Sequence, residues 1–249
     1  MEPAETLELQ CALAWPPMTG EWLGNWWLRA AGGFTGRANS ALAIGDPGLP
    51  IADALGRACD FAHSHGLAPV VQAVEDSAVE QALAALGWVP NVAHEAGHEV
   101  SVLVGPLGGP AETSRMLEVP TPGWWELCAG TNEPTEAQRH VLTTAHVLGY
   151  GVAEIGTETA GAVRVAVVDD VVHVSRLAVH PAYRRKGLAA DLMSAAGAWG
   201  AARGATRCAL QVAVTNAPAL ALYERLGFTE HHRYRYWVPG APSCEDRSS

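Results

Sequence analysis

The residues most able to do chemistry lie in one short segment, 177–189, which reads LAVHPAYRRKGLA. Its apolar start predicts a strand. A turn with one proline and three cations then leads through Gly187 into a predicted helix that ends near Arg203. The first N–H groups of a helix have no partner within it, and the helix dipole adds positive potential there. Because a glycine lets an anion approach the main chain closely, this segment has the composition of a phosphate-binding site.

The charge of the turn supports this interpretation. Lys186 is the only lysine of a chain whose formal net charge is −10, and it follows Arg184 and Arg185 directly. Three cations at a helix start favour an anion site over an ordinary solvent-exposed turn. The pattern Arg184-x-x-Gly187-x-Ala189 is weak by itself, because a match of this kind occurs by chance in about one chain in four of this length. No Gly-Lys-[Ser/Thr] follows the turn, which excludes a P-loop kinase motif.

A second segment, residues 210–228, makes the signal specific. It predicts an apolar strand, then a helix with Asn216 as its cap, Pro218 in its first turn and Gly227 where it stops. Together the two segments resemble the core of the GCN5-related N-acetyltransferases over roughly residues 115–238. The most diagnostic part is the run NAPALALYERLGF, which starts at Asn216.

The resemblance implies an α/β fold with a mixed sheet and helices on both faces. It also implies an enzyme that uses acetyl-CoA as acyl donor, without a metal, and a primary amine that attacks the thioester directly. The turn would bind the pyrophosphate, and the end of the preceding strand would pair with the pantetheine arm as another strand would. Asn216 would contact the same arm, and Tyr223 matches the general acid that protonates the leaving thiolate. The expected acetyl-CoA-binding residues are Leu177, Ala178, Val179, Arg184, Arg185, Lys186, Gly187, Leu188, Ala189, Ala190 and Asn216.

The general base is less well defined by the sequence. In several family members it is a glutamate four residues before the position of Leu177, where this chain has His173. With regular alternation, His173 shares a strand face with Ser175, Leu177 and Val179 and points into the cleft, and the usual pKa of histidine suits a base. A histidine that fills a half-buried strand is the structural alternative, and Glu154 on an earlier strand is the other candidate base.

The chain also repeats itself. When Gly87-Trp88 is placed on Gly227-Phe228, residues 71–86 fall on residues 211–226. A repeat of this size predicts two similarly folded halves. The first copy carries Asp46-Pro47-Gly48 where the second has three cations, and an aspartate there would repel a phosphate. Two unrelated α/β halves are the alternative.

We therefore expect the first half to be a truncated, degenerate copy that supports an active second half. A Gly/Pro-rich stretch at residues 105–111 marks the break. The predicted parts are a degenerate half-domain at 1–108, a catalytic domain at 109–240 and a disordered tail at 241–249.

Composition limits the setting of the protein. Its negative charge argues against a nucleic-acid partner, which would require a basic face. Five cysteines without metal-binding spacing suit a reducing compartment, and no apolar run is long enough to span a membrane. The acidic N-terminus does not resemble a signal peptide. We therefore expect a cytoplasmic protein without a membrane or metal partner, and the choice between monomer and homodimer is open.

The acceptor amine, on a small molecule or a protein, is not identified by any motif. An acidic protein would attract a cationic amine such as a polyamine, an aminoglycoside or a lysine side chain. Tryptophans of the first half either line an acceptor pocket between the halves or fill the core; they are Trp22, Trp26, Trp27 and Trp88. Two other functions stay open: a non-catalytic acyl-CoA-binding module, and an acyltransferase with a different donor or acceptor.

Overall fold

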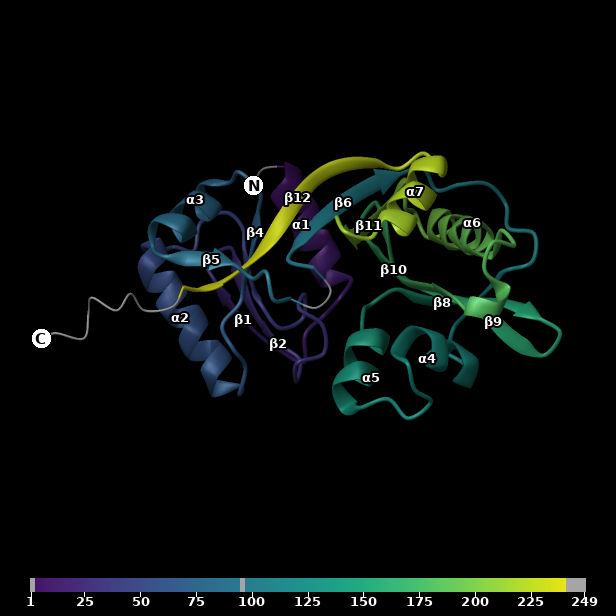
Figure 1. The fold of residues 1–249 in the computed structure, drawn as a ribbon, viewed down its shortest axis with the longest axis horizontal. Helices are drawn as coiled ribbons and strands as arrows, with labels where there is room; N and C mark the ends of the chain where they lie inside the picture. Colours follow the sequence, from purple (N-terminus) through teal and green to yellow (C-terminus); the bar gives the residue numbers. More distant parts are fainter. Residues whose placement is uncertain (1–2, 95–96, 241–249) are drawn as a thin grey trace, which may run out of the picture.

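A 12-stranded mixed sheet runs through the whole molecule, with helices packed on both of its faces (Figure 1). The computed structural model describes residues 3–94 and 97–240, so the predicted tail at 241–249 lies outside the described residues. The predicted mixed α/β fold is confirmed. Within the described residues, the model contains no helix with the length and apolar character needed to cross a membrane.

The elements follow one another in two similar series. The first half contains α1 (Pro3–Leu13), β1 (Thr19–Leu23), β2 (Trp26–Ala30), β3 (Ala41–Ala43), α2 (Ile51–Ser64), β4 (Val71–Val74), α3 (Ala78–Ala85), β5 (Trp88–Pro90) and β6 (Glu99–Gly105). The second half contains β7 (Arg115–Leu117), α4 (Pro122–Ala129), α5 (Glu136–Thr143), β8 (Leu148–Ile155), β9 (Glu158–Val168), β10 (Val171–Val179), α6 (Leu188–Ala201), β11 (Arg207–Ala213), α7 (Ala217–Arg225) and β12 (Thr229–Pro239). A short 3₁₀ turn, Pro181–Tyr183, connects β10 to α6.

The predicted repeat is present in the fold. In each half, an antiparallel hairpin leads into a strand that pairs in parallel with the next strand, across a helix. In the first half these are β3 and β4, joined by α2, and in the second they are β10 and β11, joined by α6. The next helix and strand of each half, α3 with β5 and α7 with β12, also correspond.

The two halves exchange their last strands. β6, the end of the first half, lies between β11 and β12 of the second half and is antiparallel to both. In return, the end of β12 pairs with β4 through residues 234–237 and with β5 through residues 237–239 (Figure 1). The sheet is therefore continuous, and the predicted boundary at residues 108–109 divides the chain without dividing the sheet.

Local sequence signals explain the elements of the second half. Asp169 adopts φ of +51° in the tight turn between β9 and β10, as the two adjacent aspartates predict. Thr135 caps α5 in a capping box with Gln138. Apolar side chains of β9, β10 and β11 then form one core with α6 and α7, which includes Val163 and Leu192. This core holds the start of α6 and of α7 beside the same edge of the sheet.

Candidate active site

The site begins where β10 and β11 separate. The two strands pair from Val171 with Arg207 to Val174 with Leu210. Beyond that point both strands continue, but they no longer pair with each other. A β-bulge shifts the register of β10 against β9 between Ser175 and Ala178. Such bulges bend a strand and increase its twist. The main chain of the last residues of β10 consequently lies along an open gap.

A cleft of about 720 Å³ occupies this gap. Its walls are the end of β10, the turn before α6, the first turn of α6 and one side of α7 along its whole length. Ten of the eleven residues predicted to bind acetyl-CoA line the cleft: Leu177, Ala178, Val179, Arg184, Arg185, Gly187, Leu188, Ala189, Ala190 and Asn216. The eleventh, Lys186, does not line it; its ammonium group lies 5.2 Å from the centre of the Tyr183 ring.

The start of α6 has the features of an anion site. Gly187 is its N-cap residue, with φ of +82°, and no side chain caps the first N–H groups. A Cβ atom at this glycine would meet open space, so the backbone conformation rather than crowding favours glycine. The Arg184 side chain donates from Nε to the Val179 oxygen at 3.4 Å, which ties the turn to the strand. An uncapped helix start beside two arginines suits a phosphate group.

Asp191, in the first turn of α6, positions the chain that enters the second half. Its carboxylate accepts hydrogen bonds from the main-chain N–H groups of Glu112, Thr113 and Ser114 and from the Thr113 hydroxyl. Partial burial opposes its ionisation, but these donors hold the pKa of the Asp191 carboxyl well below its usual value. The segment ahead of β7 is thereby fixed on α6.

Asn216 and Tyr223 lie on the other wall of the cleft. Asn216 caps α7, because its side chain accepts from the Ala219 N–H at 3.3 Å. Tyr223 lines the cleft with 8% of its surface exposed, and its ring packs 5.7 Å from that of Phe228. Burial, with a smaller effect from Cys208, raises the pKa of Tyr223 to about 12. The phenol is therefore neutral at pH 7 and can donate a proton.

His173 does not have the position that the sequence analysis gave it. The bulge interrupts the alternation of β10, since Ser175 pairs with Arg164 and Ala178 with Ala162 on the same face of β9. His173 therefore shares a face with Ser175 and Ala178, and the prediction that it shares one with Leu177 and Val179 is wrong. A bulge that inserts one residue reverses every side chain beyond it, and regular alternation could not reveal it.

The surroundings of His173 also argue against its role as a base. The side chain is fully buried and lines neither cavity of the site. Burial, reinforced by Arg37 and Arg164, holds the pKa of His173 well below its usual value, although Gln211 acts in the opposite direction. Glu154, the other candidate, forms an exposed ion pair with Arg115 at 2.9 Å and lines neither cavity.

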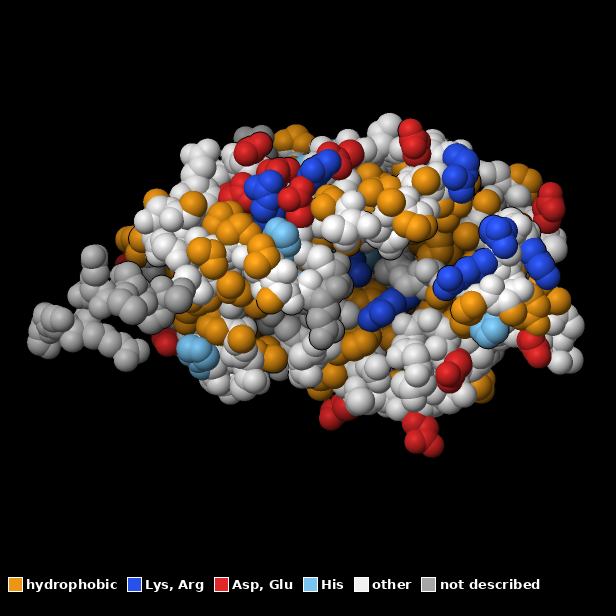
Figure 2. Space-filling model, in the orientation of Figure 1, with side chains coloured by type: hydrophobic (Ala, Val, Ile, Leu, Met, Phe, Trp, Pro, Cys, Tyr) orange, Lys and Arg blue, Asp and Glu red, His pale blue; other side chains and the backbone are white. Residues whose placement is uncertain are grey.

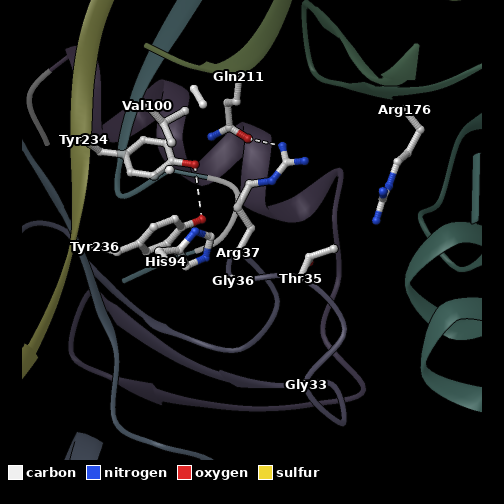
Figure 3. A pocket seen from close by; sticks show the side chains of 12 residues that line it. Gly33, Thr35, Gly36, Arg37, His94, Val100, Arg176, Gln211, Tyr234 and Tyr236 are labelled. Atoms are coloured by element: carbon white, nitrogen blue, oxygen red, sulfur yellow. Dashed lines mark hydrogen bonds between the residues drawn. The ribbon is translucent and has the colours of Figure 1, made fainter. Parts of the chain in front are cut away.

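A second cavity, of about 490 Å³, lies between the two halves on the other side of the split strands (Figure 3). We call it the acceptor cavity, after the role that we propose for it. Its wall combines the loop from Gly33 to Arg37, His94 and Gly97 of the first half with residues of β10, β11 and β12, among them Arg176. Arg176 directly precedes Leu177 of the first cleft, so the walls of the two cavities use consecutive residues of β10. Figure 2 shows arginine or lysine side chains in a hollow between the halves.

The four tryptophans proposed for an acceptor pocket between the halves do not line the acceptor cavity. Trp26 and Trp88 fill the core of the first half, and Trp22 stacks on Trp27 at 4.9 Å. The residues that do line the cavity carry no common motif, because they come from loops and strands far apart in the chain. Within residues 3–94 and 97–240, no cluster of three or more His, Cys, Asp or Glu residues suits a metal ion.

The mixed sheet, with two parallel strands that separate beside an uncapped helix start, agrees with the fold that the resemblance to the GCN5-related N-acetyltransferases implies. Solved structures agree with this fold. A GCN5-related N-acetyltransferase from Kribbella flavida matches 98% of this chain and 99% of its own, with a TM-score of 0.67 and 15% identity. A tandem GNAT protein from the clavulanic acid biosynthesis pathway matches 80% of this chain and 74% of its own, with a TM-score of 0.57 and 18% identity.

Sequence comparison gives a narrower assignment. The family described as "probable histone acetyltransferase Rv0428c C-terminal" matches residues 4–237. A protein of Mycobacterium tuberculosis named probable histone acetyltransferase Rv0428c is 30% identical over 245 residues, which cover 92% of this chain and 72% of that protein. The chain belongs to this family, and the predicted resemblance to tandem GCN5-related acetyltransferases is confirmed.

Proposed function

We propose that this protein is an N-acetyltransferase that moves the acetyl group of acetyl-CoA to a primary amine by direct attack. The observation that carries the proposal is the cleft at the split of β10 and β11. One cavity combines an unpaired strand edge, an uncapped helix start and a buried tyrosine that is neutral at pH 7. These groups match the three needs of a thioester donor: phosphate binding, alignment of an amide-containing arm and protonation of a thiolate.

Binding of the donor would use both walls of the cleft. The N–H groups after Gly187, with Arg184 and Arg185, would hold the pyrophosphate. The main chain of residues 177–179 would pair with the amides of the pantetheine arm, and Asn216 would contact the same arm. One N–H group of that strand would also stabilise the negative charge that develops on the thioester oxygen during attack.

Proton transfer would involve Tyr223 at one end of the reaction. As the amine attacks the carbonyl carbon, the C–S bond breaks and the sulfur takes up the proton of the phenol. The tyrosinate is then reprotonated from solvent. A phenol with a pKa near 12 stays protonated throughout the physiological range, so it is always ready to act as the acid.

The amine must reach the thioester in its neutral form. His173 is too deeply buried to accept its proton, and we no longer assign it as the base. Arg37 and Arg176 line the acceptor cavity, and a positive surrounding lowers the pKa of an ammonium group brought beside it. Water would carry the proton of the amine away, and any positive charge that the bound substrate leaves unneutralised would favour the neutral amine.

We also propose that residues 109–240 carry the catalytic groups and that residues 1–108 are a degenerate half that completes the acceptor cavity. The exchange of β6 and β12 supports this division of roles, because the second half needs a strand of the first to complete its sheet. The competing function, a non-catalytic acyl-CoA-binding module, would not require an acid in the cleft, whereas Tyr223 lies there.

The test is turnover. Release of the CoA thiol would be followed with acetyl-CoA and a panel of amines, and mass spectrometry would identify the acetylated product. Propionyl-CoA and succinyl-CoA in parallel would test the alternative of a different donor. We expect acetyl-CoA to be used best. Binding of acetyl-CoA without thiol release for any amine would instead support the non-catalytic module.

A further inference from the structure

Three arginines surround one buried tryptophan beside the acceptor cavity. Trp15 is fully buried, and its indole N–H donates to the Thr35 hydroxyl at 2.9 Å. The guanidinium carbons of Arg37, Arg164 and Arg176 lie 4.7, 4.9 and 5.8 Å from the centre of its ring. Such cation–π contacts hold the guanidinium groups in place without neutralising their charge.

The partners of these arginines are neutral. Arg37 donates to the side-chain oxygen of Gln211, and Arg164 donates to the main-chain oxygens of Val141 and Leu142. Arg164 is completely buried, and one of its terminal nitrogens has no hydrogen-bond partner. Arg176 forms no ion pair with any described residue; its guanidinium also lies 5.0 Å from the centre of the Phe34 ring.

No described aspartate or glutamate lines the acceptor cavity. The buried carboxylate of Glu8 lies behind Gln211 and is occupied by other donors. Its oxygens accept from Gln72, from Gln211 at 3.4 Å and from His232 at 3.0 Å. Among the described residues, the arginines of the cavity wall are therefore not matched by a carboxylate in that wall, although the chain as a whole carries a net charge of −10.

This arrangement costs free energy in the absence of an anion. Burial lowers the pKa of Arg164 to about 9, so this guanidinium remains protonated at pH 7. Burial, with the nearby Arg37, also lowers the pKa of Arg176. Buried charges are normally paired. Figure 3 shows that the Arg37 and Arg176 side chains belong to different walls of the cavity.

We propose that the acceptor is a small amine that carries an anionic group, a carboxylate or a phosphate, and that Arg37 and Arg176 bind this group. The inference rests on the proposed function and specifies its substrate class. Guanidinium groups match the planar geometry of a carboxylate and the oxygens of a phosphate with paired hydrogen bonds. With the anion held there, the amine of the same molecule faces β10 at Leu177, where the donor cleft begins.

The net charge of −10 predicts a cationic amine as acceptor, and the cavity wall favours an anionic one instead. An acidic protein attracts cationic amines at long range, but the local wall decides which of them can enter. A polyamine or a lysine-rich protein tail would bring further positive charge against Arg37 and Arg176, which form no ion pair with any described residue, in a site partly shielded from water.

The test compares matched acceptors. Each anionic amine is paired with its neutral or cationic counterpart: β-alanine with β-alaninamide, phenylalanine with phenylalaninamide, and phosphoethanolamine with ethanolamine. Spermidine and a lysine-rich peptide complete the panel. We expect kcat/KM to be at least about 30-fold higher for the anionic member of the preferred pair. The amino-acid and phosphoethanolamine pairs distinguish a carboxylate from a phosphate.

Variants connect the preference to the arginines. Arg176→Gln and Arg37→Gln should each reduce the ratio within the preferred pair about 30-fold or more. Arg37→Lys keeps the charge and should retain part of the ratio. Arg57→Gln removes an exposed arginine of the first half and should leave the ratio unchanged. Thermal stabilisation by acetyl-CoA, measured for each variant, verifies that the fold and the donor cleft are intact.

A second readout does not require turnover. In the presence of CoA, the N-acetylated form of the preferred anionic amine should raise the melting temperature further, and its uncharged counterpart should not. The inference is overturned if spermidine or the amides are acetylated better, if the arginine variants keep the ratio, or if no anionic member is acetylated or stabilises the CoA complex. Failure of acetyl-CoA itself to bind would overturn the proposed function as well, so the two failures are distinguishable.

Discussion

Replacement of Tyr223 by phenylalanine isolates one hydroxyl group of the cleft. We expect Tyr223→Phe to lower kcat about 10²- to 10⁴-fold, the usual contribution of a general acid. This corresponds to about 3–5.5 kcal/mol of activation free energy. The phenol is almost fully protonated at pH 8, because its pKa is about 12, so the whole population of the wild-type enzyme benefits from it.

The same substitution should hardly affect folding or donor binding. The ring of residue 223 would keep its place in the core beside Phe228, and only the hydroxyl is removed from a side chain that is 8% exposed. We expect a change in the free energy of unfolding within about 1 kcal/mol. Tyr150→Phe, at a tyrosine of β8 that is also buried, is the matched control and should keep full activity.

The pH dependence gives an independent check. An acid with a raised pKa acts below that pKa and fails only as the pH rises through it. The wild-type rate should therefore show no falling limb from Tyr223 up to pH 10. Stopped-flow or steady-state detection of the CoA thiol, over pH 6 to 10, measures both the kcat of Tyr223→Phe and the pH dependence of the wild-type rate. Turnover of Tyr223→Phe within threefold of the wild type, with normal acetyl-CoA binding, would refute the role of Tyr223.

Three further predictions concern the framework of the site. Asp191→Asn weakens four hydrogen bonds to the segment ahead of β7 and should cost about 1–2 kcal/mol at pH 7. Because the pKa of the folded carboxyl is lowered, urea unfolding should show this difference begin to shrink as the pH falls below about 4, where the unfolded carboxyl is protonated, and continue to shrink towards the pKa of the folded carboxyl. Gly197→Ala places a Cβ 1.4 Å from the Leu107 oxygen and should lower the melting temperature, measured by calorimetry, strongly. In Gly56→Ala, in α2, the new Cβ meets nothing within 4 Å, so the same measurement should show a higher melting temperature. His173→Gln should keep kcat/KM within about threefold if the protein remains folded by circular dichroism, since the buried imidazole makes no contribution as a base.

Much of the second half could be predicted because its signals are local. Hairpin residues, helix caps and a terminating glycine act within a few positions of one another, so the turn at Asp169, the cap at Asn216 and the helix start after Gly187 were all identifiable. Ten of the eleven predicted donor-binding residues line one cleft for the same reason, since they lie on two short segments at adjacent ends of a parallel strand pair.

The acceptor side could not be predicted in the same way. The bulge at Arg176 reverses the faces of β10, and nothing in an apolar strand sequence marks where one residue is inserted. The exchange of β6 and β12 depends on contacts between residues more than a hundred positions apart. The acceptor cavity depends on this exchange, because Arg37 of the first half reaches Gln211 of the second half only when the two halves share one sheet.

The central claim is that the cleft between β10 and β11 binds acetyl-CoA through the start of α6. The most direct measurement is the melting temperature of the protein with and without acetyl-CoA, for the wild type and for Arg184→Ala/Arg185→Ala. At a hundredfold excess over the dissociation constant, acetyl-CoA should stabilise the wild type by about 2.7 kcal/mol, or about 5–10 °C. The double variant should show a much smaller shift at the same concentration, and Arg57→Ala the full one. No shift of the wild type, or an equal shift of the double variant, would contradict the account.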